Sequence, residues 1–122
     1  MAATYNNLYL DARKRLREAG VEGAQLEARG LVCCAAGKSR EQFYRDMALY
    51  ASDPVEEKLA ELLERRLAGE PVAYLIGEWE FYGLGLDITP DVLIPRMDTE
   101  VLAERAILLA RAAGEGARVL DL

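Results

Sequence analysis

Two pairs of side chains in this 122-residue chain have the types and spacing that chemistry could use. Glu78 and Glu80 stand two residues apart, so in an extended strand both carboxylates share one face, where such a pair can serve as general acid and base. Alternating acids on an exposed strand face usually serve solvation, and we assign them no catalytic role. The sequence therefore predicts no catalytic residue within the chain.

The second pair is Cys33 and Cys34, which are adjacent within a helical pattern. Neighbours on a helix point about 100° apart, so a disulfide between them would strain the backbone. Two cysteines in a chain without histidine also make a poor zinc site. We expect buried, reduced thiols and no bound metal.

Tyrosine and arginine side chains offer a different kind of chemistry, which is protein recognition. Tyr5, Tyr44 and Tyr50, together with Arg40 and Arg45, could form a protein-binding face on a helical domain. Ordinary half-buried packing of amphipathic side chains explains the same residues. Both interpretations stay open at this point.

The overall composition limits the class of protein. Hydrophobic residues make up 52% and charged residues 30%, as in a folded globular chain, and the net charge is −6. An acidic chain argues against direct binding to nucleic acid. The basic cluster at Arg13, Lys14, Arg15 and Arg17 has the acidic residues Asp11 and Glu18 beside it, as on a solvated helix face. No secretory signal and no apolar run of the ~20 residues that span a bilayer is visible, so we expect a cytoplasmic protein without a membrane partner.

Helices are predicted for the first 75 residues, because apolar residues recur there at spacings of three and four. The expected helices cover residues 6–19, residues 22–36, a segment starting at Ser39, residues 53–67 and one turn at residues 71–75. Gly30 lies inside the second helix, where glycine costs about 1 kcal/mol relative to alanine. It indicates either a close approach of two helices or mere sequence drift.

Helix starts and buried faces can also be predicted. Ser39 with Gln42 has the spacing of a capping box, and Asp53 before Pro54 is expected to cap the next helix. The side chains expected to face a core are Leu8, Ala12, Leu16, Ala19, Leu26, Leu31, Val32, Phe43, Met47, Tyr50, Val55, Leu59, Leu62, Leu63 and Leu67. Together these helices would form a small bundle.

From residue 78 the apolar period changes to two, which predicts a β-hairpin. Trp79 and Phe81 share its buried face, and Gly83-Leu84-Gly85 is the expected turn. Asp98 and Thr99 are expected to cap a helix over residues 98–113. Residues 118–122 form an apolar run typical of a buried parallel strand in a doubly wound sheet, whose ligand site lies beyond the carboxyl end of the strand.

Three segments in register then resemble one family. GEPVAYLIGEWEFYGL, VLIPRMDTEVL and RVLDL are similar to the HemK/PrmC proteins, which are glutamine methyltransferases acting on peptide release factors. The resemblance covers residues 68–122 with specific motifs and the helical part more loosely. Met97 and Gly85 depart from it, since proline is frequent at both positions in the family. Both departures affect loop rigidity and not chemistry.

The resemblance implies a fold, mainly α, and a division into domains. The fold would be an N-terminal helical bundle, then a β-hairpin, then the first helix and strand of a Rossmann-like α/β methyltransferase domain. Residues 1–75 would be the bundle that binds the release factor, residues 76–97 the hairpin and linker, and residues 98–122 the incomplete start of the catalytic domain.

It also implies an activity, which is transfer of a methyl group from S-adenosylmethionine to the glutamine amide of the GGQ motif. The glycine-rich cofactor loop and the NPPY motif would lie beyond residue 122, so we expect this chain alone to be inactive. We also expect it to be a monomer. Pro95, Arg96, Thr99 and Glu100 would border the cofactor pocket. The alternatives are that they only begin the helix, and that the chain is an independent helical interaction module without enzymatic activity.

Overall fold

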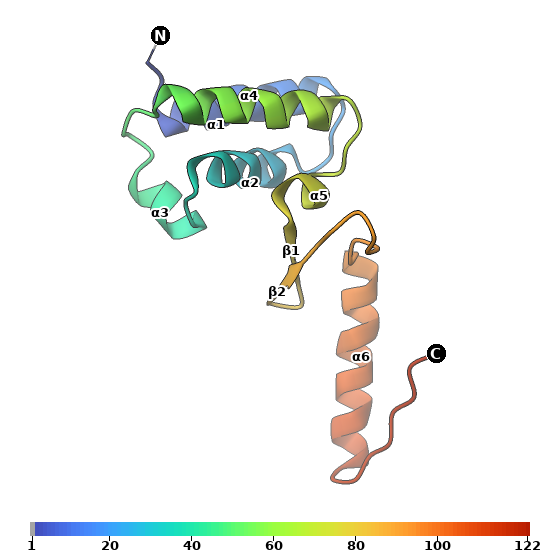
Figure 1. Ribbon diagram of the computed structural model, residues 1–122. Helices are drawn as coiled ribbons and strands as arrows, with labels where there is room; N and C mark the ends of the chain where they lie inside the picture. Colours follow the sequence, from blue (N-terminus) through green and yellow to red (C-terminus); the bar gives the residue numbers. More distant parts are fainter. Residues whose placement is uncertain (1) are drawn as a thin grey trace. The chain divides into compact units, whose positions relative to one another are not determined.

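The computed structural model describes residues 2–122, which form two compact units divided between Gly77 and Glu78. The first unit holds five helices, shown in Figure 1. They are α1 (Tyr5–Glu18), α2 (Ala24–Ala36), α3 (Arg40–Arg45), α4 (Asp53–Leu67) and α5 (Val72–Ile76). All five segments that the sequence predicts to be helical within the first 75 residues are therefore confirmed.

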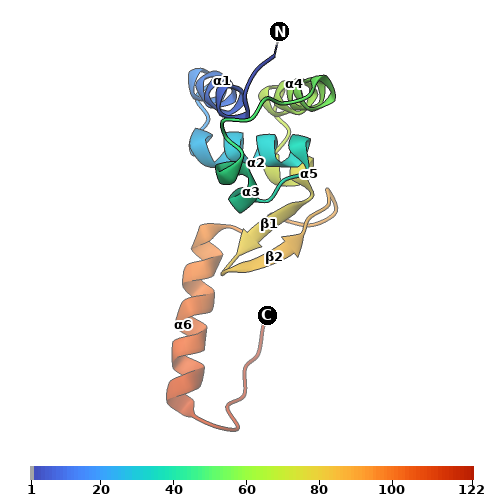
Figure 2. The same cartoon turned by 90° about the vertical axis from the view of Figure 1, so that its left-hand side faces the viewer.

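Helix α2 is the centre of the first unit. Helices α1 and α4 lie side by side against one side of α2, as the two views in Figures 1 and 2 agree, and both run antiparallel to it. The short helices α3 and α5 also pack against α2. Its buried residues are mostly small or β-branched: Ala24, Ala28, Leu31, Val32 and Ala35. Small side chains at this spacing let four neighbouring helices approach one short helix.

Most of the predicted core is buried, with Leu16, Leu31, Val32 and Phe43 the largest side chains almost wholly removed from solvent. Leu26 is wrong as a core residue, because it is 51% exposed. It is two residues after the buried Ala24 and two before the buried Ala28, so it points to the opposite face of α2.

Tyr50 is a second wrong assignment to the core. It is 70% exposed, because α3 ends at Arg45 and does not carry the helical pattern as far as residue 50. Instead Tyr50 lies in extended backbone, where it forms an isolated antiparallel bridge with Thr4. Leu67 and Ala19, both at the ends of helices, are exposed as well.

The capping box at the start of α3 is confirmed in both directions. The Gln42 backbone N–H donates to Ser39 Oγ over 3.1 Å, and the Ser39 backbone N–H donates to Gln42 Oε1 over 2.9 Å. Thr4 caps α1 with a single side-chain hydrogen bond, in which its Oγ1 atom accepts the backbone N–H of Asn7. The sequence prediction had overlooked this second cap.

Two other predicted caps are wrong. Asp53 is the first residue of α4, which Ser52 precedes. Asp98 and Thr99 lie inside the first turn of the helix α6 (Met97–Ala113), which Arg96 precedes. Neither preceding residue accepts a side-chain capping hydrogen bond. The acidic residues still favour these helix starts, because they lie near the positive end of the helix dipole.

The second unit consists of β1 (Glu78–Phe81), β2 (Leu84–Asp87) and α6 (Met97–Ala113). The strands pair antiparallel, with Phe81 opposite Leu84, so the loop between them is only Tyr82-Gly83. Both loop residues have positive φ, +52° and +77°, as in a type I′ turn. The predicted turn at residues 83–85 was therefore placed too late by one residue.

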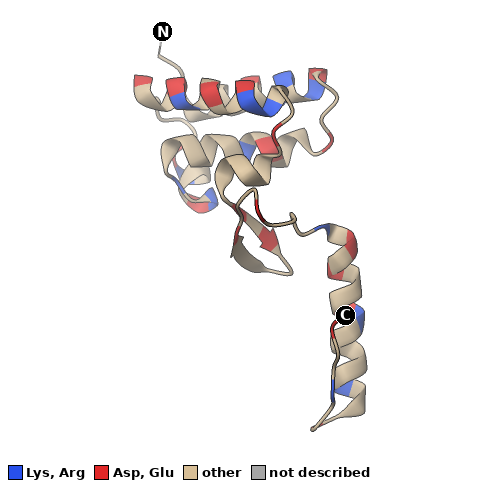
Figure 3. Cartoon of the chain, turned by 45° about the vertical axis from the view of Figure 1, so that its right-hand side comes forward, with Lys and Arg blue, Asp and Glu red and all other residues tan. Residues whose placement is uncertain are grey.

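The alternation along β1 is confirmed, since Trp79 and Phe81 are half-buried while Glu78 and Glu80 are exposed. Figure 3 shows that the hairpin carries acidic residues, whereas acidic and basic residues are interleaved along the bundle helices. Helix α6 is confirmed but has no buried residue. Residues 118–122 are exposed and form no strand, because β1 and β2 pair with each other and leave this segment without a strand partner among residues 2–122.

Candidate functional site

The four residues that the sequence predicts at a cofactor site lie on one short stretch, where the loop after β2 becomes α6. Arg96 has extended backbone, and its carbonyl accepts the Thr99 N–H over 3.0 Å and the Glu100 N–H over 3.3 Å. The helix therefore starts through main-chain bonds, which leaves the Arg96 and Thr99 side chains exposed. Pro95 and Glu100 are half-buried.

Glu100 makes a side-chain hydrogen bond that joins α6 to the hairpin. Its Oε1 atom accepts a hydrogen bond of 2.8 Å from the backbone N–H of Tyr82, at the tip of the hairpin. Tyr82 lies in the turn, outside the ladder of β1 and β2, and here a carboxylate satisfies its N–H. Sequence reasoning missed this contact because a backbone donor leaves no mark in the pattern of side chains.

The assignment of these four residues to a cofactor site stays a prediction. A carboxylate is the group expected to hold ribose hydroxyls, and one oxygen of Glu100 is already engaged by Tyr82. Of the other three residues, Arg96 and Thr99 are exposed and Pro95 is half-buried. A shallow pocket occurs at the opposite end of α6, lined by Ile107, Ala110, Arg111 and residues 114–117, and it includes none of the four.

Replacing Glu100 tests the contact with the hairpin. We expect Glu100→Ala to speed amide hydrogen exchange at Tyr82 roughly 3- to 10-fold, since a hydrogen bond of this kind contributes about 1 kcal/mol. Glu100→Gln keeps an acceptor oxygen and should restore most of the protection. Equal exchange rates in the wild-type chain and Glu100→Ala would show that the bond does not persist in solution.

The tyrosines and arginines that suggested a recognition face lie around α3. Tyr44 accepts a hydrogen bond of 2.8 Å from Arg29 Nη1, and the Arg29 guanidinium also lies over its ring. Tyr5 is covered by the Lys38 ammonium, 5.1 Å from the ring centre. Arg40 is exposed at the first position of α3. Tyr5 and Arg45 are connected through Lys38, because Lys38 lies over the Tyr5 ring and pairs with the same aspartate, Asp46, as Arg45 does.

This ion cluster is centred on Asp46, the one buried charged side chain among the described residues. Lys38 Nζ lies 2.7 Å from Asp46 Oδ2, and Arg45 donates from Nε to Oδ1 at 3.0 Å and from Nη2 to Oδ2 at 3.1 Å. These hydrogen bonds, that of Arg45 first, hold the pKa of the Asp46 carboxyl far below its usual range, although burial acts in the opposite direction. The cluster ties the end of α3 to the segment after α2.

Acid should therefore weaken the bundle through Asp46. Because its pKa is lower in the folded chain than in the unfolded chain, its contribution is complete above pH about 4 to 5 and is lost as the pH falls through the folded value. We expect Asp46→Asn to lower the melting temperature at pH 7, with the difference from wild type shrinking towards pH 2. Asp11→Asn, on the exposed face of α1, is the control and should keep the wild-type pH dependence. A constant difference between Asp46→Asn and wild type at all pH values would contradict this.

The thiols are free, as expected, but only half-buried. Cys33 Sγ lies 3.9 Å from the Ser39 carbonyl oxygen, and burial raises the pKa of this thiol, while Arg29 acts against the rise. A raised pKa means less thiolate at neutral pH and a less reactive sulfur. In the described part of the chain no helix is long and apolar enough to cross a membrane.

Comparison with known proteins defines the class. The family model described as the PrmC N-terminal domain matches residues 7–77, which is more than half of the chain. The match includes helices α2 to α5 entirely and nearly all of α1. The chain therefore belongs to the PrmC family.

Similar proteins from other organisms carry a name that states their activity. The "Release factor glutamine methyltransferase" of Haemophilus influenzae is 44% identical over 89 residues, covering 73% of this chain and 30% of the relative. The protein of the same name from Vibrio cholerae is 38% identical over 122 residues, covering 100% and 42%. That from Bordetella pertussis is 48% identical over 104 residues, covering 80% and 36%.

The chain thus spans well under half the length of these relatives. The similarity to the Vibrio protein runs through both units and includes the hairpin and the stretch from Pro95 to Glu100. The relatives are methyltransferases by name, and their names state the substrate of those proteins.

Proposed function

We propose that this chain is the N-terminal part of a protein methyltransferase that methylates the glutamine side-chain amide in the GGQ motif of peptide chain release factors. The observation that carries the proposal is the similarity over the full 122 residues to a release factor glutamine methyltransferase. S-adenosylmethionine would supply the methyl group. The role of this chain would be to recognise the release factor.

The proposed division of labour follows the helices and strands. Residues 1–75 would be the domain that binds the release factor, residues 76–97 the hairpin and linker, and residues 98–122 the start of the methyltransferase domain. A cooperative bundle centred on α2 supports the first assignment, because a rigid helical surface can bind a protein partner with little ordering cost. We propose that the chain is a monomer, and that free thiols at Cys33 and Cys34 reflect a cytoplasmic location.

Pro95, Arg96, Thr99 and Glu100 are proposed to border the cofactor site without forming it alone. Glu100 has one carboxylate oxygen engaged by Tyr82, so its other oxygen is the one that a cofactor hydroxyl would use. By orienting this carboxylate, the hairpin tip would influence the edge of the site. We therefore propose that residues 1–122 alone bind S-adenosylmethionine too weakly to measure and have no activity.

The proposal is tested with the 122-residue chain and with its reading frame expressed at the length of the relatives. We expect the long form to add one methyl group to a release factor glutamine, seen by mass spectrometry of the GGQ peptide, and the 122-residue chain to add none. Calorimetric titration of the short chain with S-adenosylmethionine should give no binding at micromolar concentrations. A methylated release factor that lacks its GGQ glutamine would refute the proposed substrate atom.

A further inference from the structure

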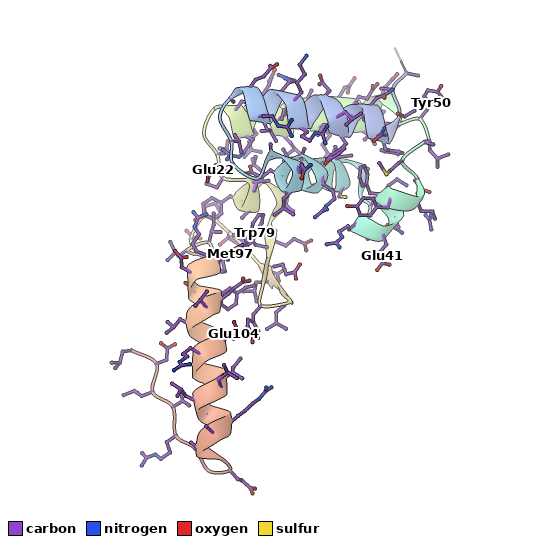
Figure 4. All side chains as sticks on the ribbon, turned by 180° about the vertical axis from the view of Figure 1, so that it is seen from behind. Glu22, Glu41, Tyr50, Trp79, Met97 and Glu104 are labelled. Atoms are coloured by element: carbon purple, nitrogen blue, oxygen red, sulfur yellow. The ribbon has the colours of Figure 1, made fainter. Side chains whose placement is uncertain are left out.

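One surface of the bundle has the properties of a docking site. It consists of the exposed side chains of Arg45, Ala48, Leu49 and Tyr50, which follow one another at the end of α3 and are called here the 45–50 surface. Leu49 is 55% and Tyr50 70% exposed, the two highest values for large apolar side chains among the described residues of the first unit. Figure 4 shows Tyr50 at the end of the bundle where α1 begins.

The backbone beneath this surface is firmly held. The Tyr5 N–H donates to the Leu49 carbonyl over 3.0 Å, and the Ala51 N–H donates to the Ala3 carbonyl over 2.8 Å. Between these bonds Tyr50 forms its bridge with Thr4. A backbone that is already held by hydrogen bonds has little entropy left to lose when a partner covers this surface, which favours binding.

The positive charge of the residues around the 45–50 surface favours a partner with a negatively charged group. Residues 38–50 contain three basic side chains, Lys38, Arg40 and Arg45, against two acidic ones, Glu41 and Asp46, so this segment is positive by one within a chain whose net charge is −6. Asp46 is buried and already paired, which leaves Arg45 as the exposed charge of the 45–50 surface. The guanidinium of Arg45 has five N–H donors, and its two bonds to Asp46, from Nε and Nη2, use two of them.

We propose that the 45–50 surface binds a segment of the release factor that presents an apolar side chain to Leu49 and Tyr50 and a carboxylate to Arg45. The inference rests on the proposed function, which supplies the partner, and adds where and by what chemistry it is bound. Tyrosine and arginine are the residue types enriched where interfaces gain most of their energy. The outer faces of α1 and α4 carry mixed charges instead (Figure 3).

The test measures the affinity of the 122-residue chain for a purified release factor by calorimetry. We expect the double variant Leu49→Ser/Tyr50→Ser to bind about tenfold more weakly than wild type. Leu26→Ser removes a similarly exposed leucine from α2 and should stay within about twofold of wild type. Arg45→Gln should lose several-fold in affinity and reduce the salt dependence of binding, because it removes the charge that attracts the carboxylate. Melting temperatures of all variants confirm that the fold is kept.

The outcomes separate the two proposals. If wild type binds and the double variant binds equally well, or if Leu26→Ser is as weak as the double variant, the 45–50 surface is not the docking site, while the proposed function stands. If the wild-type chain shows no saturable binding to the release factor, the recognition role itself fails. Sedimentation that detects a dimer of wild type but not of the double variant would assign the surface to self-association and overturn the proposal.

Discussion

Phe43→Ala is expected to lower the free energy of unfolding of the bundle by about 3 to 5 kcal/mol. Phe43 is 1% exposed and is the buried residue of the six-residue helix α3. Its ring meets Tyr9 edge to face with centroids 5.8 Å apart, and the Tyr44 ring at 5.6 Å. A helix of six residues has almost no stability of its own, so α3 depends on this side chain.

Urea unfolding followed by circular dichroism measures the loss. Tyr44→Ala is the neighbouring control, since that ring is 50% exposed and its removal should cost much less. Phe43→Leu keeps most of the buried volume and should also lose less than Phe43→Ala. A Phe43→Ala variant within about 1 kcal/mol of wild type would mean that α3 is not held by this ring.

Gly30→Leu is expected to destabilise the bundle by about 1 to 3 kcal/mol, although leucine is the better helix former. A Cβ atom at Gly30 would lie 2.8 Å from Ile76 Cδ1, closer than carbon atoms approach in folded proteins. Glycine thus lets α5 lie directly against α2. The choice that the sequence left open at Gly30 is settled in favour of close approach.

A double-mutant cycle isolates this contact. Gly30→Ala meets only the end of a flexible side chain, so its gain in helix propensity and its clash should nearly cancel. In the background Ile76→Val, which lacks the Cδ1 methyl, the same change should stabilise the bundle by about 0.5 to 1 kcal/mol. Equal effects of Gly30→Ala in both backgrounds would contradict a steric contact between the two residues.

The sequence predicted what local patterns encode. Apolar spacing found all the helices, and the Ser39 and Gln42 pair found a cap whose two hydrogen bonds both form. Prediction from the sequence was wrong where the packing of other helices decides which apolar residues of a helix are buried. Leu26 fits an apolar stripe, yet α2 is covered on the face that carries Ala24 and Ala28.

The position of the turn and the contact made by Glu100 were missed for related reasons. Glycine at residues 83 and 85 drew the predicted turn too far along the chain, because tyrosine rarely takes the left-handed conformation that Tyr82 adopts. The hydrogen bond from Tyr82 to Glu100 spans 18 residues and uses a main-chain donor, so no spacing rule could find it. The assignment of Pro95, Arg96, Thr99 and Glu100 to a cofactor site came from family resemblance and stays a prediction.

The absence of any buried residue in α6 has a practical consequence for handling this polypeptide. Val101, Leu102, Leu108 and Leu109 are each more than half exposed along a 17-residue helix. Such a helix should adsorb detergent and brighten an environment-sensitive dye such as ANS. Thermolysin, which prefers bonds beside large aliphatic residues, should cut there long before it reaches the helices around α2.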